Sequence, residues 1–149
     1  MKKYFKFIFL ILWIGIIIAF SSQVATDSRK LSRGVTVRIV EVIKRVRPNT
    51  EINVYLLNRK IRKFAHFINY MILGIIITLV LKKKELGNKK IFLFSLLFCI
   101  IIASLDEYYQ SFIPGRGARL KDVFIDSFGA LVGIGLGRVI ENVKFTIGS

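Results

Sequence analysis

Five residues of the kinds that transfer protons or bind cations are concentrated in two parts of this sequence. Four of the nine acidic residues fall between positions 106 and 126, and the single histidine is His66. An imidazole that a carboxylate orients can act as a general base or a general acid. We therefore take the histidine and three of the acids as candidate catalytic residues: His66, Asp106, Glu107 and Asp122.

Other polar side chains near these positions are suited to holding a ligand. Arg62 precedes His66 by four positions, so the two side chains share one face of a helix. Asp126 follows Asp122 at the same spacing, and an arginine such as Arg116 can hold a phosphate or a carboxylate by paired hydrogen bonds. The candidate ligand-binding residues are Arg62, Gln110, Arg116 and Asp126.

The cofactor is not determined by these residues. A divalent cation held by Asp106, Glu107 and Asp122, with or without His66, fits their chemistry, but the spacing typical of a particular metal is absent. The sequence therefore does not decide whether the protein binds a metal or another cofactor, or whether it is an enzyme. Cys99 is the only cysteine, which excludes an intrachain disulfide and a thiolate cluster, and we expect it to pack inside an apolar helix.

A structural interpretation competes with the functional ones. Adjacent carboxylates such as Asp106 and Glu107, at the edge of an apolar helix, are costly unless they are paired, hydrated or bound to a cation. Arg116, Arg119 and Lys121 follow closely and can neutralise them. On this interpretation the acidic residues belong to a charge-paired cluster that closes one end of a helical bundle.

Long apolar segments must position these residues. Of the 149 residues, 54% are hydrophobic, and they fall into runs close to the roughly 20 residues that cross a bilayer. We predict transmembrane helices at about 7–25, 64–81, 91–107 and 122–140, within one domain that covers residues 1–149. A signal peptide is the alternative for the first segment, because lysines precede it, although Gln23-Val24-Ala25 is a poor cleavage match.

The segment between the first two predicted spans is amphipathic. At positions 28–47 one helical face collects apolar residues, and most charged residues avoid it: Leu31, Val35, Ile39, Val42, Ile43 and Val46. This pattern predicts either a helix in the plane of the lipid head groups or an ordinary helix packed on the bundle. The expected fold is all-α, an integral membrane bundle of about four transmembrane helices plus one amphipathic interfacial helix.

The number of spans decides where the polar residues lie. With four spans, the start of the second, the end of the third and the start of the fourth reach the same side of the membrane, so His66, Asp106 and Asp122 should converge. Most of the 24 basic residues, which contribute to a net charge of +15, flank the apolar runs, as expected of a protein whose partner is the lipid bilayer. We do not expect nucleic-acid binding. It would require a basic folded surface with elements that read the bases, and the sequence does not indicate one.

The distribution of basic residues also predicts an orientation. Ten of the 24 lysines and arginines fall on the side of the amino terminus and the 82–90 loop, and the other fourteen fall on the opposite side. Short loops and the first span carry most weight in the positive-inside rule. We therefore expect the amino terminus in the cytoplasm and the polar residues at the outer face.

Small residues on the last predicted span form a stripe with the two aspartates. Gly129, Gly133 and Gly137 recur every four residues and continue the helical face of Asp122 and Asp126. Such spacing lets a neighbouring helix approach closely. We expect packing inside the bundle, with the aspartates facing inward, and a homo-oligomer is the alternative.

Several short segments that contain most of the candidate residues occur in a definite order. They are Phe20-Ser21-Ser22-Gln23, Arg62-Lys63-Phe64-Ala65-His66, Asp106-Glu107-Tyr108-Tyr109-Gln110, Pro114-Gly115-Arg116, Asp122 and Gly129. Their order and spacing, over roughly residues 20–137, resemble those of the VanZ-like family of bacterial membrane proteins. The family usually has an asparagine where this chain has Asp126, so the resemblance assigns no role to that position.

The resemblance implies a multi-pass protein of the bacterial cytoplasmic membrane and a link to resistance against teicoplanin-type glycopeptide antibiotics. It supplies no reaction. The leading hypothesis is a cell-envelope protein whose outer-face site binds or modifies an anionic component, such as a phosphate-bearing lipid or a lipid-linked precursor. The alternative is a non-enzymatic membrane protein that acts by helix association, with a structural polar cluster.

Overall fold

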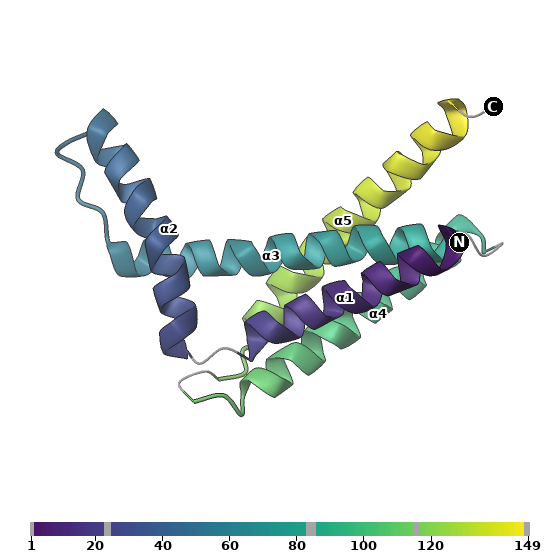
Figure 1. Ribbon diagram of the computed structural model, residues 1–149, viewed down its shortest axis with the longest axis horizontal. Helices are drawn as coiled ribbons and strands as arrows, with labels where there is room; N and C mark the ends of the chain where they lie inside the picture. The colour runs from purple at the N-terminus through teal and green to yellow at the C-terminus, as the bar shows by residue number, and fades with distance from the viewer. Residues whose placement is uncertain (1, 23–24, 83–85, 115–116, 148–149) are drawn as a thin grey trace.

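The computed structural model describes residues 2–22, 25–82, 86–114 and 117–147, and over these residues it contains helices and no strands (Figure 1). The helices are α1 (Lys2–Ser21), α2 (Ala25–Val46), α3 (Val54–Leu81), α4 (Asn88–Gln110) and α5 (Leu120–Ile147). All except α2 are long and apolar enough to cross a membrane. The predicted all-α membrane bundle with four spanning helices is confirmed.

The second spanning helix begins earlier than its apolar segment. The side chain of Asn53 accepts a hydrogen bond from the backbone N–H of Leu56 at 3.1 Å, which caps the first turn of α3. The polar residues after this cap are good helix formers, so they continue the helix although they are not part of the apolar segment. Arg62 and His66 therefore lie more than two turns inside α3.

Helices α3 and α5 form the most extensive interface of the bundle. Glycines make this close approach possible, since a Cβ added to Gly129 or Gly133 would overlap the backbone oxygen of Phe67 or Met71. Gly129 meets Phe67, and four residues further along each helix Gly133 meets Met71. Because the contacts occur in the same order along both helices, α3 and α5 run in the same direction (Figure 1). The prediction that the glycine stripe packs inside the bundle is confirmed.

The core lies where α4 and α1 join this pair. It combines Tyr70 and Leu73 of α3 with Cys99 and Ala103 of α4, and these small α4 residues allow the helices to approach. Cys99 is buried and packs as expected. On the other side, the indole N–H of Trp13 in α1 donates to a backbone carbonyl of α3 at 3.0 Å.

Helix α2 lies across the direction of the spanning helices, beside the first half of α3 (Figure 1). It contacts α3 through the buried Thr36, whose hydroxyl lies 3.3 Å from the side-chain oxygen of Asn58. Its apolar stripe faces elsewhere, because Val35, Val42 and Val46 are 52%, 60% and 76% exposed. The bundle therefore leaves Val35, Val42 and Val46 of this hydrophobic face uncovered.

Candidate functional site

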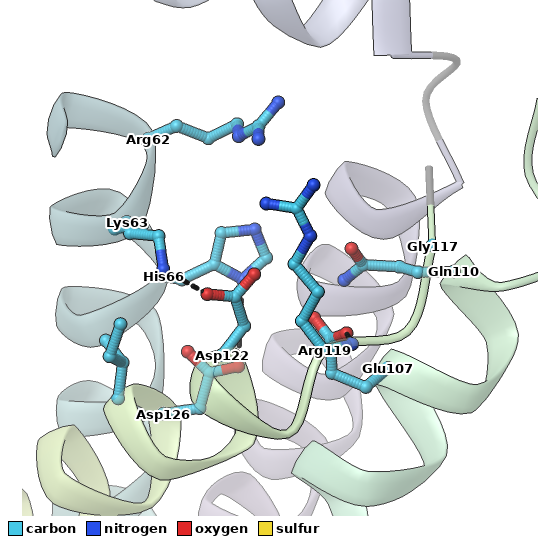
Figure 2. Close-up of a pocket in the computed structure, with 10 residues that line it drawn as sticks. Arg62, Lys63, His66, Glu107, Gln110, Gly117, Arg119, Asp122 and Asp126 are labelled. Atoms are coloured by element: carbon cyan, nitrogen blue, oxygen red, sulfur yellow. Dashed lines mark hydrogen bonds and ion pairs between the residues drawn. The ribbon is translucent and has the colours of Figure 1, made fainter. Parts of the chain in front are cut away.

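Segments from three helices and one loop meet around a pocket at one end of the bundle (Figure 2). Its volume is about 70 Å³, which is room for a few water molecules or a small polar group. The pocket is lined by Arg62, Lys63, His66, Glu107, Gln110, Gly117, Arg119, Asp122, Ile125 and Asp126. The convergence expected from the span count is therefore present in the structure.

The pocket contains most of the residues that the sequence singled out. Arg62, His66, Glu107, Gln110, Asp122 and Asp126 line it. Asp106 lies immediately behind, hydrogen-bonded to the side chain of Gln110. Arg116 lies outside the described residues, so its predicted role as an anion ligand stays a prediction.

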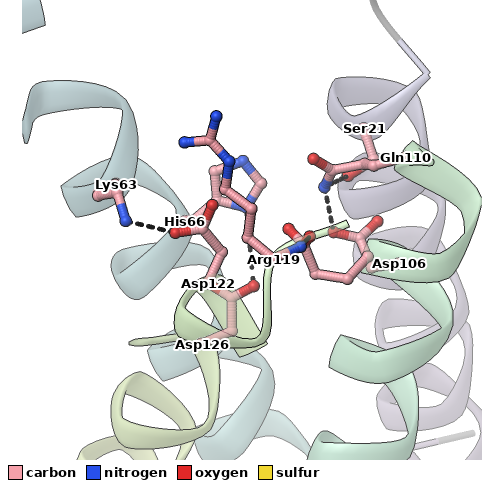
Figure 3. A network of polar contacts seen from close by, with 9 residues as sticks. Ser21, Lys63, His66, Asp106, Gln110, Arg119, Asp122 and Asp126 are labelled. Atoms are coloured by element: carbon pink, nitrogen blue, oxygen red, sulfur yellow. Dashed lines mark hydrogen bonds and ion pairs between the residues drawn. The ribbon is translucent and has the colours of Figure 1, made fainter. Parts of the chain in front are cut away.

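Two side-chain contacts connect α3 to α5 along one wall of the pocket. Lys63 forms a short ion pair with Asp122, and Nδ1 of His66 lies 3.9 Å from Oδ2 of Asp126 (Figure 3). Lys63 and His66 are three residues apart on one helix, and the aspartates are four apart on the other. Because the two helices run in the same direction, these spacings place the two pairs one above the other.

Gln110 connects α4 to the end of α1. Its side-chain N–H group donates to Oδ2 of Asp106 at 2.9 Å and lies 3.4 Å from the hydroxyl oxygen of Ser21 (Figure 3). All three side chains are buried. The amide thus orients one oxygen of Asp106 while it holds two helices together.

Glu107 holds the loop between α4 and α5 against the bundle. Its Oε2 accepts a hydrogen bond from the backbone N–H of Arg119 at 2.8 Å. This contact brings the Arg119 side chain to the pocket, on the same side as Arg62 (Figure 2). Neither of these two guanidinium groups forms an ion pair with another residue of the described chain.

Asp126 is the most deeply buried charged residue of the pocket lining. Its side chain is 1% exposed, and neither carboxylate oxygen accepts a hydrogen bond from any residue that the structure describes. Its negative charge is opposed by Asp106, Glu107 and Asp122, and Lys63 offsets only part of this repulsion. A buried carboxylate in these surroundings is costly, so it requires a further explanation.

Three side chains converge in a way that suits a metal ion. One ligand atom each from His66, Asp106 and Asp126 lies within 4.8 Å of the other two. The sequence instead predicts Asp106, Glu107 and Asp122, with or without His66, as the potential metal ligands. In the structure Glu107 accepts from a backbone amide and Asp122 pairs with Lys63, so these two carboxylates have other partners.

An apolar groove lies beside the polar pocket, between α1 and α4. It has a volume of about 220 Å³. Its lining is Ile14, Ile17, Ile18, Ile102, Leu105, Asp106 and Tyr109. Asp106, the one acidic residue of this lining, reaches the pocket through its hydrogen bond with Gln110. The groove therefore brings a hydrophobic surface next to the polar site.

Three residues of the site are not among the candidates that the sequence indicates. Lys63 lines the pocket, Arg119 reaches it from the loop, and Ser21 meets Gln110 from α1. A signal for Lys63 was present, because a separation of three residues places Lys63 on the same helical face as His66. Ser21 belongs to the Phe20-Ser21-Ser22-Gln23 segment of the family resemblance, but its contact with Gln110 depends on how α1 packs against α4.

Comparison with known proteins gives one match. The family model described as VanZ/LLP1 matches residues 5–141, which is nearly the whole chain and includes every element of the pocket. Searches of curated proteins and of solved structures found no match.

Proposed function

Because this chain belongs to the VanZ-LLP1 family of membrane proteins, we propose that it binds a phosphate-bearing lipid of the bacterial envelope in its polar pocket. The observation that carries the proposal is the pair of guanidinium groups of Arg62 and Arg119. Both lie at the pocket without an ion-pair partner among the described residues. Two such groups can hold a phosphate through charge-assisted, paired hydrogen bonds.

The apolar groove supports a lipid as the source of that phosphate. It lies between the membrane-spanning helices α1 and α4 and meets the polar residues at Asp106. A head group in the pocket thus leaves an acyl or polyprenyl chain next to a hydrophobic surface. A soluble phosphate compound without an apolar chain would leave this groove unoccupied.

His66 is the group that would move a proton if the bound lipid is also modified. It lies on the pocket wall beside Asp126, and a carboxylate at this position can orient an imidazole. The proposal places the pocket at the outer face of the cytoplasmic membrane. It includes a contribution to resistance against teicoplanin-type glycopeptides, as the family resemblance implies.

Lipid binding by the purified chain tests the proposal. Native mass spectrometry would compare retention of a polyprenyl phosphate and of phosphatidylglycerol with that of the zwitterionic phosphatidylcholine. We expect preferential retention of the two anionic lipids. The combined change Arg62→Gln and Arg119→Gln should weaken that preference at least about tenfold, because each charged hydrogen bond contributes roughly 1.5–3 kcal/mol.

The matched control is Arg47→Gln, which removes an exposed arginine that does not line the pocket. This variant should retain anionic lipids as the wild type does. Equal retention of all three lipids by the wild type, or unchanged retention by the double variant, would contradict the proposal.

The alternative function, association without catalysis or lipid binding, has its own supporting observation. The polar contacts of Lys63, Glu107 and Gln110 each join different elements of the bundle. On this alternative, substitutions at the pocket lower function only as far as they lower the melting temperature. Melting curves of the purified variants, measured beside the lipid-binding assay, separate the two.

A further inference from the structure

We propose that His66, Asp106 and Asp126 form a binding site for a divalent transition-metal cation of the Zn²⁺ or Mn²⁺ type. Helices α3, α4 and α5 each contribute one ligand, and two of the three, His66 and Asp126, line the polar pocket. The inference does not depend on the lipid proposed above, because the three protein ligands are already brought together by the fold.

The geometry of the three ligand atoms suits such an ion. Zn²⁺ binds imidazole nitrogen and carboxylate oxygen at about 2.0–2.2 Å, so two of its ligand atoms lie about 3–4 Å apart. Nδ1 of His66 and Oδ2 of Asp126 are separated by 3.9 Å. The atoms of all three residues lie within 4.8 Å of one another, so small side-chain rotations complete the coordination.

The carboxylate of Asp126 gives independent support for a cation. It is buried, lines the pocket, and its oxygens accept no hydrogen bond from the described residues. Three further carboxylates lie close enough to oppose its charge. A divalent cation between Asp126 and Asp106 supplies the missing partner and cancels this repulsion.

The ligand types select the kind of metal. One imidazole and two carboxylates suit Zn²⁺ or Mn²⁺, whereas Mg²⁺ and Ca²⁺ prefer oxygen ligands alone. The hydrogen bond from Gln110 to Oδ2 of Asp106, at 2.9 Å, orients this ligand from outside the coordination sphere. Three protein ligands leave a position that faces the pocket, where water or a phosphate oxygen can bind.

The test uses the metal alone. The full chain, purified in detergent and stripped with a chelator, is titrated with ZnCl₂ and separately with MnCl₂ in a calorimeter, without added lipid. We expect one ion per chain. Asp126→Asn, which preserves the shape of the side chain, should weaken binding by at least about tenfold, since even outer contacts of a metal site contribute about 10–100-fold.

The control variant is Glu141→Gln. Glu141 lies on the same helix but near the other end of the bundle, 3.6 Å from Lys6, so its removal should leave metal binding unchanged. Saturating metal should also raise the melting temperature of the wild type and of Glu141→Gln, but not that of Asp126→Asn.

Two results would overturn the metal site: a wild-type chain that binds neither ion, or an Asp126→Asn chain that binds as tightly as the wild type. If Asp126→Asn does not fold, His66→Gln and Asp106→Asn carry the same test, and undiminished binding by both refutes the site. Because lipid is absent, a failure here leaves the lipid proposal standing, and loss of lipid binding leaves the metal result standing.

Discussion

Lys63 and Asp122 form an ion pair between α3 and α5, one helical turn before the position at which His66 lies beside Asp126. The two pairs differ in their surroundings. The side chains of Lys63 and Asp122 are each 27% exposed, so water shares in stabilising their charges. The side chain of Asp126 is 1% exposed. The same helix interface therefore has a partly exposed ion pair and, one turn further on, a buried carboxylate.

The close approach of α3 and α5 predicts a strong effect of one methyl group. In Gly133→Ala the new Cβ would overlap the backbone oxygen of Met71, so the helices must separate. We expect the free energy of unfolding to fall by about 1–3 kcal/mol, the usual cost of overpacking. Reversible unfolding in a detergent titration measures the change.

Gly135 provides a matched control for this substitution. It lies on the same helix, and a Cβ added to it would meet no atom within 4 Å. Gly135→Ala should therefore leave stability unchanged or raise it slightly, because alanine favours the helix over glycine. If both alanine variants change the free energy of unfolding by the same amount, the close approach of α3 and α5 does not depend on Gly133.

If the pocket is the functional site, a substitution of His66 should abolish function while the amount of protein in the membrane stays the same. His66→Ala removes an imidazole from the pocket wall, and His66 is not part of the hydrophobic core cluster. When the gene is expressed in a teicoplanin-sensitive bacterium, we expect wild-type protein to raise the inhibitory concentration and the variant to leave it at the level of an empty vector. Immunoblots of membranes should show equal abundance.

Glu107→Gln tests a second pocket residue, one that also holds the loop between α4 and α5. The glutamine oxygen can still accept the N–H of Arg119, so the loop should stay in place while one negative charge is lost. We expect reduced function with normal abundance. Full resistance from both variants would show that the pocket is not the functional site.

Helix α2 is predicted to place its apolar stripe in the membrane interface. A nitroxide label at Val42→Cys, in a Cys99→Ala background, should collide more with dissolved oxygen than with a water-soluble nickel complex. Val42 is 60% exposed and belongs to the stripe. A label at Lys44→Cys, about 200° around the helix, should show the reverse preference. Equal access of the two reagents at both positions would contradict an interfacial helix.

The proposed position of the pocket at the outer face predicts which residues a reagent outside the cell can label. Ser111 is exposed directly after α4, at the same end as the pocket, and Lys89 is exposed near the start of α4 at the other end. In cells with Cys99 replaced, a membrane-impermeant maleimide should label Ser111→Cys and not Lys89→Cys. The reverse pattern would place the pocket in the cytoplasm and remove an outer-face lipid as its ligand.

The sequence by itself determined the helical class, the number of spanning helices and the end of the bundle at which the polar residues lie. The thickness of the hydrocarbon imposes a minimum length on each span, so a run of apolar residues is a local signal that needs no knowledge of packing. The span count then places residues 62–66, 106–110 and 122–126 at one end. The spacing of Gly129 and Gly133 predicted their packing face for the same reason, because helical periodicity is local.

Only the tertiary structure decided which polar groups meet. Lys63 pairs with Asp122, Glu107 accepts from the loop, and Asp126 lies buried without a hydrogen bond from the described residues. These pairings depend on the rotation of each helix about its own axis and on its height beside its neighbours. Many apolar contacts set those two quantities together, and no single residue in the sequence specifies them. That is why His66, Asp106 and Asp126, which lie on three different helices, become recognisable as one candidate metal site only in the folded bundle.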